Sequence, residues 1–237
     1  MQAISISFFR FDGILSRIWA FAQMQFARRK LERIPEIGFY KQFGTGTGEG
    51  VTPVPNFGVY AVMATWPDLE TARARVEEAR AFRDYRAHAS ESGTVYLSAV
   101  ASRGLWDARE PFEVSQSEPA PRPIAVLTRA TVRGRHLLRF WGRTPDISET
   151  VRAQDHLRFK IGMGEVPWVQ QVTFSIWDDP ESMLAFAYRS SSHGEAVRRV
   201  RDGRWFKEEL YARFRVLHWD GTWDGRDPLR AIAGTPA

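Results

Sequence analysis

The stretch "KIGMGEVPWVQQVTFSIWDDPESMLAF", residues 160–186, decides the fold because an earlier stretch has the same organisation. It runs from a glycine turn through an alternating apolar segment, typical of a β-strand, into a helix opened by Asp-Asp-Pro-Glu. Residues 43–73 repeat this order as "FGTGTGEGVTPVPNFGVYAVMATWPDLETAR". Two such units in one chain predict an internal repeat.

The repeat extends over both halves of the chain. Alternating and β-branched segments predict strands, and apolar residues at helical spacing predict helices. In the first half the strands are expected at 3–11, 37–43, 57–66 and 93–102, with helices over 13–34 and 67–92. In the second half the strands are expected at 123–132, 156–165, 169–177 and 205–219, with helices over 136–154 and 179–203. Both halves therefore have the order β-α-β-β-α-β.

Details of the sequence align the two halves. Trp66 and Trp177 each end the third strand, and the helices that follow them align without gaps. The glycine turns are matched as "GTGE" (46–49) with "GMGE" (162–165), and the halves close alike with "WDAREPF" (106–112) and "WDGRDPL" (223–229). One supersecondary unit is therefore used twice.

The fold class predicted is α+β. A β-α-β-β-α-β unit is the ferredoxin-like split βαβ motif, whose sheet carries helices on one face and must bury the other. Two such sheets make a dimeric-type α/β barrel within one chain. We expect repeats at 1–112 and 124–229, a Pro/Ser-rich linker at 113–123 and a flexible tail at 230–237. An apolar ligand would lie between the sheets or between a sheet and its helices.

Composition excludes several kinds of site. The chain has no cysteine, which rules out disulfides, thiolate zinc sites, iron–sulfur clusters and thiolate-ligated haem. The net charge of +5 comes with no basic cluster interleaved with stacking aromatics, so no nucleic-acid partner is expected. Charged residues interrupt the apolar N-terminus, which argues against a signal peptide. We expect a cytoplasmic protein and leave open a peripheral contact with the inner membrane.

The glycine-rich "GTGTGEG" (44–50) is interpreted as a hairpin turn rather than a phosphate loop. A dinucleotide fingerprint needs a helix directly after it, whereas here Pro53, Pro55 and a strand follow. Glycines at this place supply positive φ angles.

Two of the five histidines are candidate ligands. His193 lies in "AYRSSSHGEAVRRV" among small residues that leave room for a planar ligand, and it aligns with Phe82 of the first half. His88 ends a charged helix, where a histidine ordinarily stabilises the helix dipole, and it is the second choice. We expect surface or capping roles for His136, His156 and His218, since no metal-binding spacing includes them.

Long strings of this chain resemble the spheroidene monooxygenase family of carotenoid biosynthesis. They are "RFKIGMGEVPWVQQVTFSIWDDPESMLAFAY", "HGEAVRRVRDGRWFKEELYARFRVL", "FFRFDG", "FYKQFGTGTGEGVTPVPNFGVYAVMATWPD" and "RPIAVLTRATV". The resemblance implies a haem-dependent monooxygenase that oxidises an acyclic carotenoid at C-2 to a hydroxyl and then a keto group. It also implies O2, reduced ferredoxin or a similar electron donor, and a ferredoxin-like α/β barrel.

The resemblance also implies roles for particular residues. In related haem-binding barrels a histidine on the second helix of a unit ligates the iron, and His193 matches that position. A neutral histidine gives less electron push than a thiolate, so hydrogen-bond donors on the other side should matter more. Gln170 and Gln171 are the candidates, and strand alternation directs one of them inward.

Rival interpretations keep the same fold. One is a haem enzyme for haem degradation or aldoxime dehydration. Another is a non-catalytic haem or carotenoid carrier. The third is a cofactor-free monooxygenase.

Overall fold

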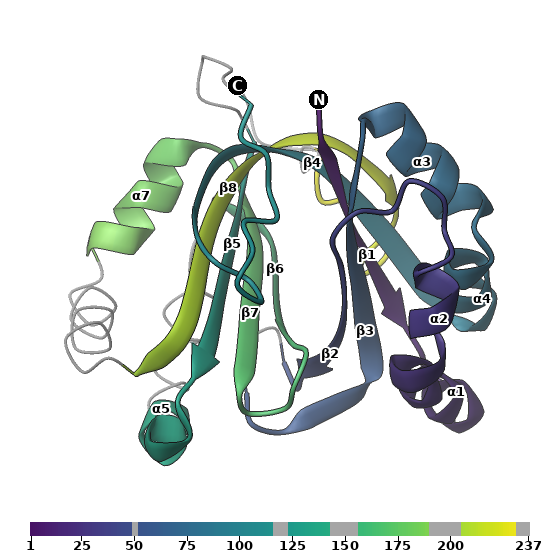
Figure 1. Ribbon diagram of the computed structural model, residues 1–237, viewed down its shortest axis with the longest axis horizontal. Helices are drawn as coiled ribbons and strands as arrows, with labels where there is room; N and C mark the ends of the chain where they lie inside the picture. Colours follow the sequence, from purple (N-terminus) through teal and green to yellow (C-terminus); the bar gives the residue numbers. More distant parts are fainter. Residues whose placement is uncertain (49–51, 116–122, 143–155, 190–204, 231–237) are drawn as a thin grey trace.

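The computed structural model describes residues 1–48, 52–115, 123–142, 156–189 and 205–230. They form a closed antiparallel barrel with helices on its outside (Figure 1). The strands are β1 (Ala3–Arg10), β2 (Tyr40–Gly46), β3 (Pro55–Trp66), β4 (Glu91–Gly104), β5 (Ile124–Val132), β6 (Leu157–Gly164), β7 (Gln170–Trp177) and β8 (Phe206–Gly221). The helices are α1 (Ile14–Phe26), α2 (Arg28–Leu31), α3 (Leu69–Glu78), α4 (Arg80–His88), the short 3-10 helix η1 (Gly134–His136), α5 (Leu137–Trp141) and α7 (Pro180–Arg189).

The strand order confirms the predicted fold class. Going round the barrel, β4-β1-β3-β2 of the first half are followed by β6-β7-β5-β8 of the second, so each half has the ferredoxin-like order. The halves join at two seams. The β4–β8 seam runs from Gly93↔Gly221 to Gly104↔Leu210, whereas the β2–β6 seam consists of Gly44↔Gly164 and Thr45↔Met163.

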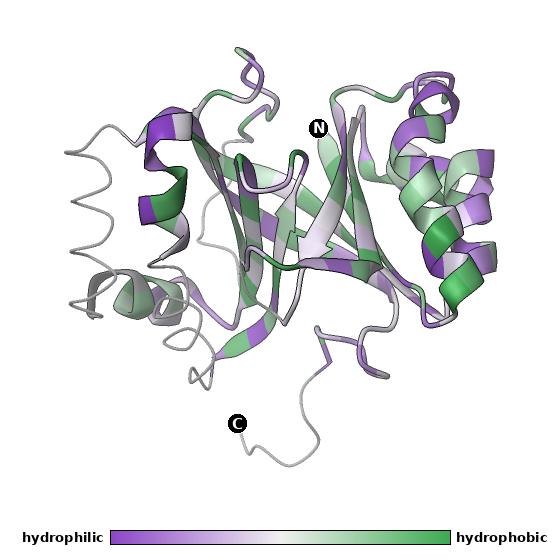
Figure 2. Ribbon diagram, turned by 90° about the horizontal axis from the view of Figure 1, so that it is seen from below, coloured by the Kyte–Doolittle hydropathy of each residue, from purple (hydrophilic) through white to green (hydrophobic). Residues whose placement is uncertain are grey.

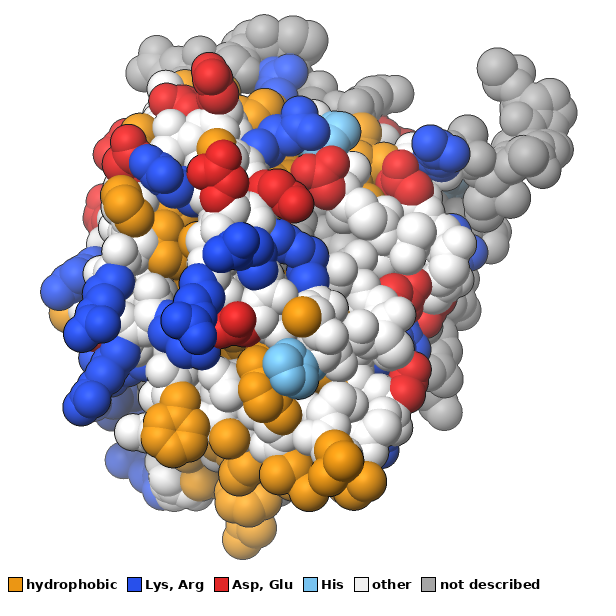
Figure 3. All heavy atoms as spheres, turned by 90° about the vertical axis from the view of Figure 1, so that its right-hand side faces the viewer, with side chains coloured by type: hydrophobic (Ala, Val, Ile, Leu, Met, Phe, Trp, Pro, Cys, Tyr) orange, Lys and Arg blue, Asp and Glu red, His pale blue; other side chains and the backbone are white. Residues whose placement is uncertain are grey.

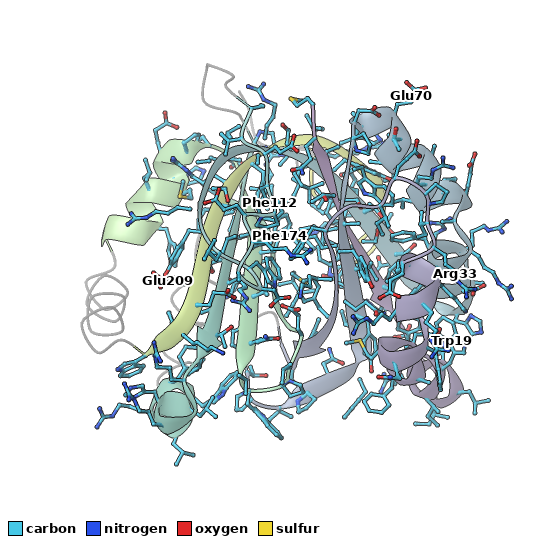
Figure 4. The ribbon with its side chains drawn as sticks, viewed as in Figure 1. Trp19, Arg33, Glu70, Phe112, Phe174 and Glu209 are labelled. Carbon is cyan, nitrogen blue, oxygen red and sulfur yellow. The ribbon has the colours of Figure 1, made fainter. Side chains whose placement is uncertain are left out.

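The barrel interior is a packed core. Inward-facing apolar residues from all eight strands form one cluster, in which the ring of Phe8 lies 5.0 Å from that of Phe159 and 6.1 Å from that of Phe174. The labelled side chains of Phe112 and Phe174 point into this centre (Figure 4). Side chains therefore fill the space between the two sheets. The other place expected for a ligand, between a sheet and its helices, lies on the outer faces of the barrel.

The two long helices expected in the first half are each broken. The segment expected at 67–92 divides at Ala79, whose ψ of 133° is extended, and β4 already begins at Glu91. The break is stabilised because Arg86 Nη1 and Nη2 donate to the carbonyls of Val76 (2.8 Å) and Glu77 (2.5 Å), which would otherwise lack partners at the end of α3. The segment expected at 13–34 also divides, into α1 and α2, although Ala27 between them keeps helical backbone angles.

The closing motifs of the two halves form matching tight turns. Trp106 bridges to Arg109 and Trp223 to Arg226, and the two central residues of each turn have positive φ angles. Each turn is held by a carboxylate from the opposite half. Glu208 accepts hydrogen bonds from the amides of Asp107 (3.1 Å) and Ala108 (2.8 Å). Glu91 accepts from the amide of Gly225 (2.8 Å).

The glycine-rich segment is a hairpin, as predicted. Gly44 and Gly46 belong to β2, Gly48 has a φ of 72°, and the amide of Thr47 donates to the carbonyl of Val54 at 2.9 Å. Within the described residues, no helix has the length and apolar content needed to cross a membrane.

Candidate functional site

The strand registers allow the two halves to be compared position by position. Ala3 pairs with Trp66 as Ile124 pairs with Trp177. Helices α3 and α7 both begin three residues after their tryptophan and have the same length. The equivalence predicted between 46–49 and 162–165 is wrong. Gln42 pairs with Val62 as Gly162 pairs with Thr173, so by register Gly162 corresponds to Gln42 and not to Gly46.

The outer face of the first half is filled by large side chains. Phe9 and Tyr60 lie opposite each other on β1 and β3, and the Phe9 ring stacks on Tyr85 of α4 at 4.8 Å. Gln42 Nε2 donates to the Tyr85 hydroxyl at 3.2 Å. Burial raises the pKa of Tyr85 well above its usual range, so that the hydroxyl stays neutral. These side chains fill the middle of this face, and an open cleft of about 880 Å³ lies nearer its edge, between α3 and β4.

The outer face of the second half has small or polar residues at the same positions. Ala130 stands in place of Phe9, Gln171 in place of Tyr60 and Gly162 in place of Gln42. Thr173 replaces Val62 and hydrogen-bonds to Thr128 on the neighbouring strand. Ala130, Gln171, Thr173 and Thr128 are all partly exposed among the described residues. We call Thr128, Ala130, Gly162, Gln171 and Thr173 the outer shelf.

Large side chains cover this sheet near the start of β5 and the end of β7. Ile124, Trp177 and Met183 form a small cluster there, and the Trp177 ring stacks on Phe186 of α7 at 5.3 Å. Helices α7 and α5 stand on this side of the barrel, while α1–α4 cover the other side (Figure 1). The outer shelf therefore lies on the helix-bearing face of the second half, beyond the apolar cluster.

The two candidate glutamines face opposite sides of the sheet, as alternation predicted. Gln170 shares the inward face with Val172 and lies opposite Thr131, which in turn pairs with Glu208. Gln171 belongs to the outer shelf, and its amide nitrogen lies near Gly164. Of the two amides, that of Gln171 can meet a ligand on the outer shelf.

A charged cluster inside the barrel was missed by sequence reasoning. Arg129 is 2% exposed and forms ion pairs with Glu208 and with Asp107. Lys41 contacts Asp107 and also Glu165, whose Oε2 lies 2.6 Å from the ammonium nitrogen. The indole of Trp106 donates to Glu165 Oε1 at 2.7 Å, and the Arg129 guanidinium lies 5.6 Å from the same ring. The signal in the sequence was strand alternation, which puts Arg129 on the same inward face of β5 as Ala125 and Leu127.

The pKa of Glu208 reflects this surrounding. Burial alone would raise it, but the amides of Ala108 and Asp107 and the charge of Arg129 together lower it below the usual value for a glutamate. Glu208 is therefore held ionised, which fits a structural clamp between β8 and the turn after β4.

The described histidines have surface positions. His88 is exposed at the end of α4, where its ring stacks on Trp19 at 3.9 Å and its Nδ1 lies 2.8 Å from the carbonyl oxygen of Asp84. His156 and His218 lie beside Asp178 (3.2 Å) and Asp220 (2.8 Å).

His136 is the last residue of η1 and the N-cap of α5, as the sequence suggested for a helix start. Loss of solvent contact and the charges of Arg135 and Arg139 lower its pKa.

No group of three His, Asp or Glu residues in the described part of the chain could hold a metal ion. His193 lies outside the described residues.

Solved structures support the fold. An aldoxime dehydratase crystallised with butyraldoxime has a TM-score of 0.59 and 9% identity, over 91% of this chain and 79% of that one. A second aldoxime dehydratase structure has a TM-score of 0.55 and 11% identity, over 91% of this chain and 81% of that one. At such identities the likeness concerns the fold alone.

The relatives in sequence show the family. No protein-family model matches the chain. Spheroidene monooxygenase of Cereibacter sphaeroides is 46% identical over 100% of this chain and 74% of its own length. The protein of the same name from Rhodobacter capsulatus is 46% identical over 97% of this chain and 96% of its own length. That of Rubrivivax gelatinosus is 30% identical over 89% of this chain and 81% of its own length. The chain is therefore a monooxygenase that belongs to the spheroidene monooxygenase family.

Proposed function

We propose that this chain is a haem-dependent monooxygenase that oxidises an acyclic, spheroidene-like carotenoid at C-2, first to a hydroxyl and then to a keto product. O2 is the oxidant, and reduced ferredoxin or a similar protein supplies the electrons. The names of the relatives in sequence support the carotenoid substrate.

The observation that carries the proposal is the difference between the two outer faces. The first half fills its face with Phe9, Tyr60 and Gln42, whereas the second half has Ala130, Gln171 and Gly162 at those positions. The second half thus lacks both aromatic rings, and its amide is on β7 (Gln171) where the first half has it on β2 (Gln42). This change fits a flat apolar group between sheet and helix better than it fits plain core packing.

The residue proposed to coordinate the haem iron, on the helix side of the site, is His193. Because α7 matches α3 in its bounds, the gap-free alignment assigns position 193 to Phe82 of α4. Phe82 is fully buried and its ring lies 6.5 Å from that of Trp66 on the sheet. A histidine at the equivalent position would face the sheet near Trp177, at the border of the site, and a neutral imidazole is an established haem ligand.

The overall chemistry sets what the site must do. Each cycle inserts one oxygen atom into a C–H bond and reduces the other to water, which consumes two electrons and two protons. Two one-electron carriers are thus oxidised per cycle. A second hydroxylation of the same carbon gives a geminal diol, which loses water to form the ketone. When bound, haem would supply the activation of O2.

The chain's own residues would orient and shield the reactants. The Gln171 amide can donate a hydrogen bond on the sheet side, and the hydroxyls of Thr128 and Thr173 lie on the same shelf. The apolar cluster with Trp177 borders the site and would keep water from one edge of it. Protein groups so placed supply orientation and electrostatics, while the cofactor supplies reactivity.

The test is a titration of the purified protein with hemin, followed by its Soret band. A saturable one-to-one band is expected, and it should be lost or shifted in His193→Ala. His88→Ala is the matched control, because it removes a histidine that stacks on Trp19 at the surface. A band that is lost in His88→Ala and unchanged in His193→Ala would assign the ligand to His88. Absence of any saturable band would overturn the haem proposal and favour a cofactor-free monooxygenase.

A product assay separates the remaining alternatives. The haem-loaded protein, spheroidene and O2 are incubated with reduced ferredoxin and its reductase, and the carotenoids are separated by chromatography. Hydroxy and keto products that depend on oxygen support the proposal. Haem binding without product would favour a carrier, and turnover of an aldoxime or of haem itself in place of carotenoid would favour the other haem enzymes.

A further inference from the structure

Helix α1 exposes its apolar face to solvent. Ile14, Leu15, Ile18, Phe21 and Phe26 are all more than half exposed, and Leu15 reaches 79%. The side of α1 turned to the barrel instead buries Ala20 and the polar Gln23, whose carbonyl accepts a hydrogen bond from Gln42. An amphipathic helix of a globular protein ordinarily buries its apolar stripe. This helix packs Trp19, Ala20 and Met24 against the core and leaves a second apolar face in solvent.

The exposed apolar surface continues across one end of the barrel. Phe21 contacts Phe57 of β3 at 5.7 Å between ring centroids. The indole of Trp168, in the β6–β7 hairpin, donates to the carbonyl of Pro53 at 2.8 Å, and the indole of Trp141 in α5 donates to the carbonyl of Trp168 at 3.1 Å. Helices α1 and α5 and both hairpins lie at the same end of the molecule (Figure 1).

Each of these further segments also presents an apolar side chain to solvent. Phe57 and Trp168 are each 52% exposed, and Leu138 of α5 is 93% exposed. Figure 2 views the molecule from this end and shows strong hydrophobic colour on the helices of the first half. In Figure 3 the apolar side chains gather along the lower edge. Exposed apolar surface that continues over four segments marks an interaction site.

The charge around this end is strongly positive. The segments that form it, residues 12–35, 52–58, 133–141 and 166–169, contain eight Arg or Lys and two Asp or Glu. Their net charge of +6 compares with +5 for the whole chain, so the remainder of the chain is nearly neutral. Lys and Arg lie beside the apolar side chains in Figure 3. An open cleft of about 620 Å³ next to α2 is lined by Glu78 and five cations, Arg29, Lys30, Arg33, Arg75 and Arg80, of which Lys30, Arg75 and Arg80 form ion pairs with Asp84 or Glu36.

We propose that this end of the barrel, with α1 at its centre, is an interfacial docking surface for an anionic lipid bilayer. An apolar helix face flanked by cations is the arrangement that inserts into the headgroup region and attracts acidic lipids. A second copy docked through the same surface would bring these like charges together, which costs free energy. The charge therefore favours lipid as the occupant.

The docking surface lies beside the outer shelf, and the role inferred for it rests on the proposed function. Gln171 of the outer shelf follows Trp168 by three residues. In the same hairpin, the backbone N–H of Gln170 donates to the carbonyl of Val166 at 3.0 Å. The docking surface thus adjoins the shelf. An apolar polyene dissolved in the bilayer could reach the shelf without crossing water.

The test is co-sedimentation of the purified full chain with sucrose-loaded vesicles, one set of phosphatidylcholine and one with about a third phosphatidylglycerol. We expect binding to the anionic vesicles that weakens as salt is raised. The variant Leu15→Ser/Ile18→Ser/Phe21→Ser should reduce partitioning by about tenfold for each side chain that no longer enters the lipid. The control Val114→Ser/Leu184→Ser changes exposed apolar residues outside the docking surface and should bind like the wild type.

A second variant tests the charge. Arg28→Gln/Arg29→Gln/Arg33→Gln should bind anionic vesicles more weakly while leaving any binding to neutral vesicles unchanged. All substituted side chains are exposed, and circular dichroism and thermal unfolding verify that each variant is folded.

Two outcomes would overturn the proposal. One is a wild type that binds neither set of vesicles. The other is a dimer seen by light scattering that the α1 variant abolishes, because the surface would then join two copies of the chain. The haem titration is independent of both results. Vesicle binding without haem binding would support the docking surface and refute the haem site.

Discussion

Gly162 on β6 occupies the position that Gln42 occupies on β2, since Gly162 pairs with Thr173 as Gln42 pairs with Val62. In the first half the Gln42 amide bonds to the buried Tyr85 hydroxyl and helps to fill the outer face. In the second half that volume is missing. The internal repeat therefore serves as its own control, because one copy is a packed face and the other a shelf.

Refilling the shelf should block the cofactor. Ala130→Phe restores the side chain that Phe9 supplies in the first half, so the dissociation constant for hemin is expected to rise by about tenfold or more, equivalent to at least about 1.4 kcal/mol. Ala130→Ser is the matched control and should bind hemin like the wild type. Equal affinity of all three proteins would place the haem elsewhere.

The two neighbouring glutamines should differ in their effect on catalysis. Gln171→Ala removes an amide from the outer shelf, and the rate of product formation is expected to fall about tenfold to a hundredfold with haem stoichiometry unchanged. Gln170→Ala removes the same group from the inward face and should have the smaller effect. Single-turnover rates measure both, and the reverse order would contradict the assignment.

Arg129 should be needed for stability. Arg129→Met leaves the carboxylates of Glu208 and Asp107 without their buried cation, and the free energy of unfolding is expected to fall by about 3–5 kcal/mol. Urea titration measures this change. Arg213→Met, on the exposed side of β8, is the control and should cost less than about 0.5 kcal/mol. A loss as small for Arg129→Met would show that the barrel tolerates Glu208 without its buried cation.

The clamp by Glu208 should make stability depend on pH in the acid range. The pKa of Glu208 is lower in the folded chain than its ordinary value of 4.5, so its contribution is present above that value and is lost as pH falls through the folded pKa. Glu208→Gln should therefore flatten the fall in unfolding free energy below about pH 4.5. Denaturant titrations at several pH values test this, and parallel curves for both proteins would refute it.

Ala108 should gain from replacement by glycine. Its φ of 59° lies in the left-handed region, and Gly225 holds the same place in the second turn with a φ of 71°. Ala108→Gly is expected to raise the free energy of unfolding by about 1 kcal/mol, and Gly225→Ala to lower it by a similar amount. Thermal and urea unfolding of both variants measure the two changes. A destabilised Ala108→Gly would mean that the entropy of the unfolded chain outweighs the strain.

The sequence by itself determined the repeat, the strand order and the α/β barrel. Period-two segments, glycine turns and the paired tryptophans Trp66 and Trp177 are local features, and two matching units have few ways to bury their sheets. Alternation also determined that Gln170 and Gln171 face opposite sides of β7. It did not tell which side was already filled, because that depends on helices far away in sequence.

Tertiary structure decided the features that involve contacts between the halves. Alternation puts Arg129 on the inward face of β5, and its charge can be buried there because barrel closure brings Glu208 and Asp107 against it. The helical spacing of Ile14 and Ile18 gave α1 an apolar face but could not say that this face remains in solvent. Periodicity records which residues share a face, whereas the identity of what lies against that face follows from packing over the whole chain.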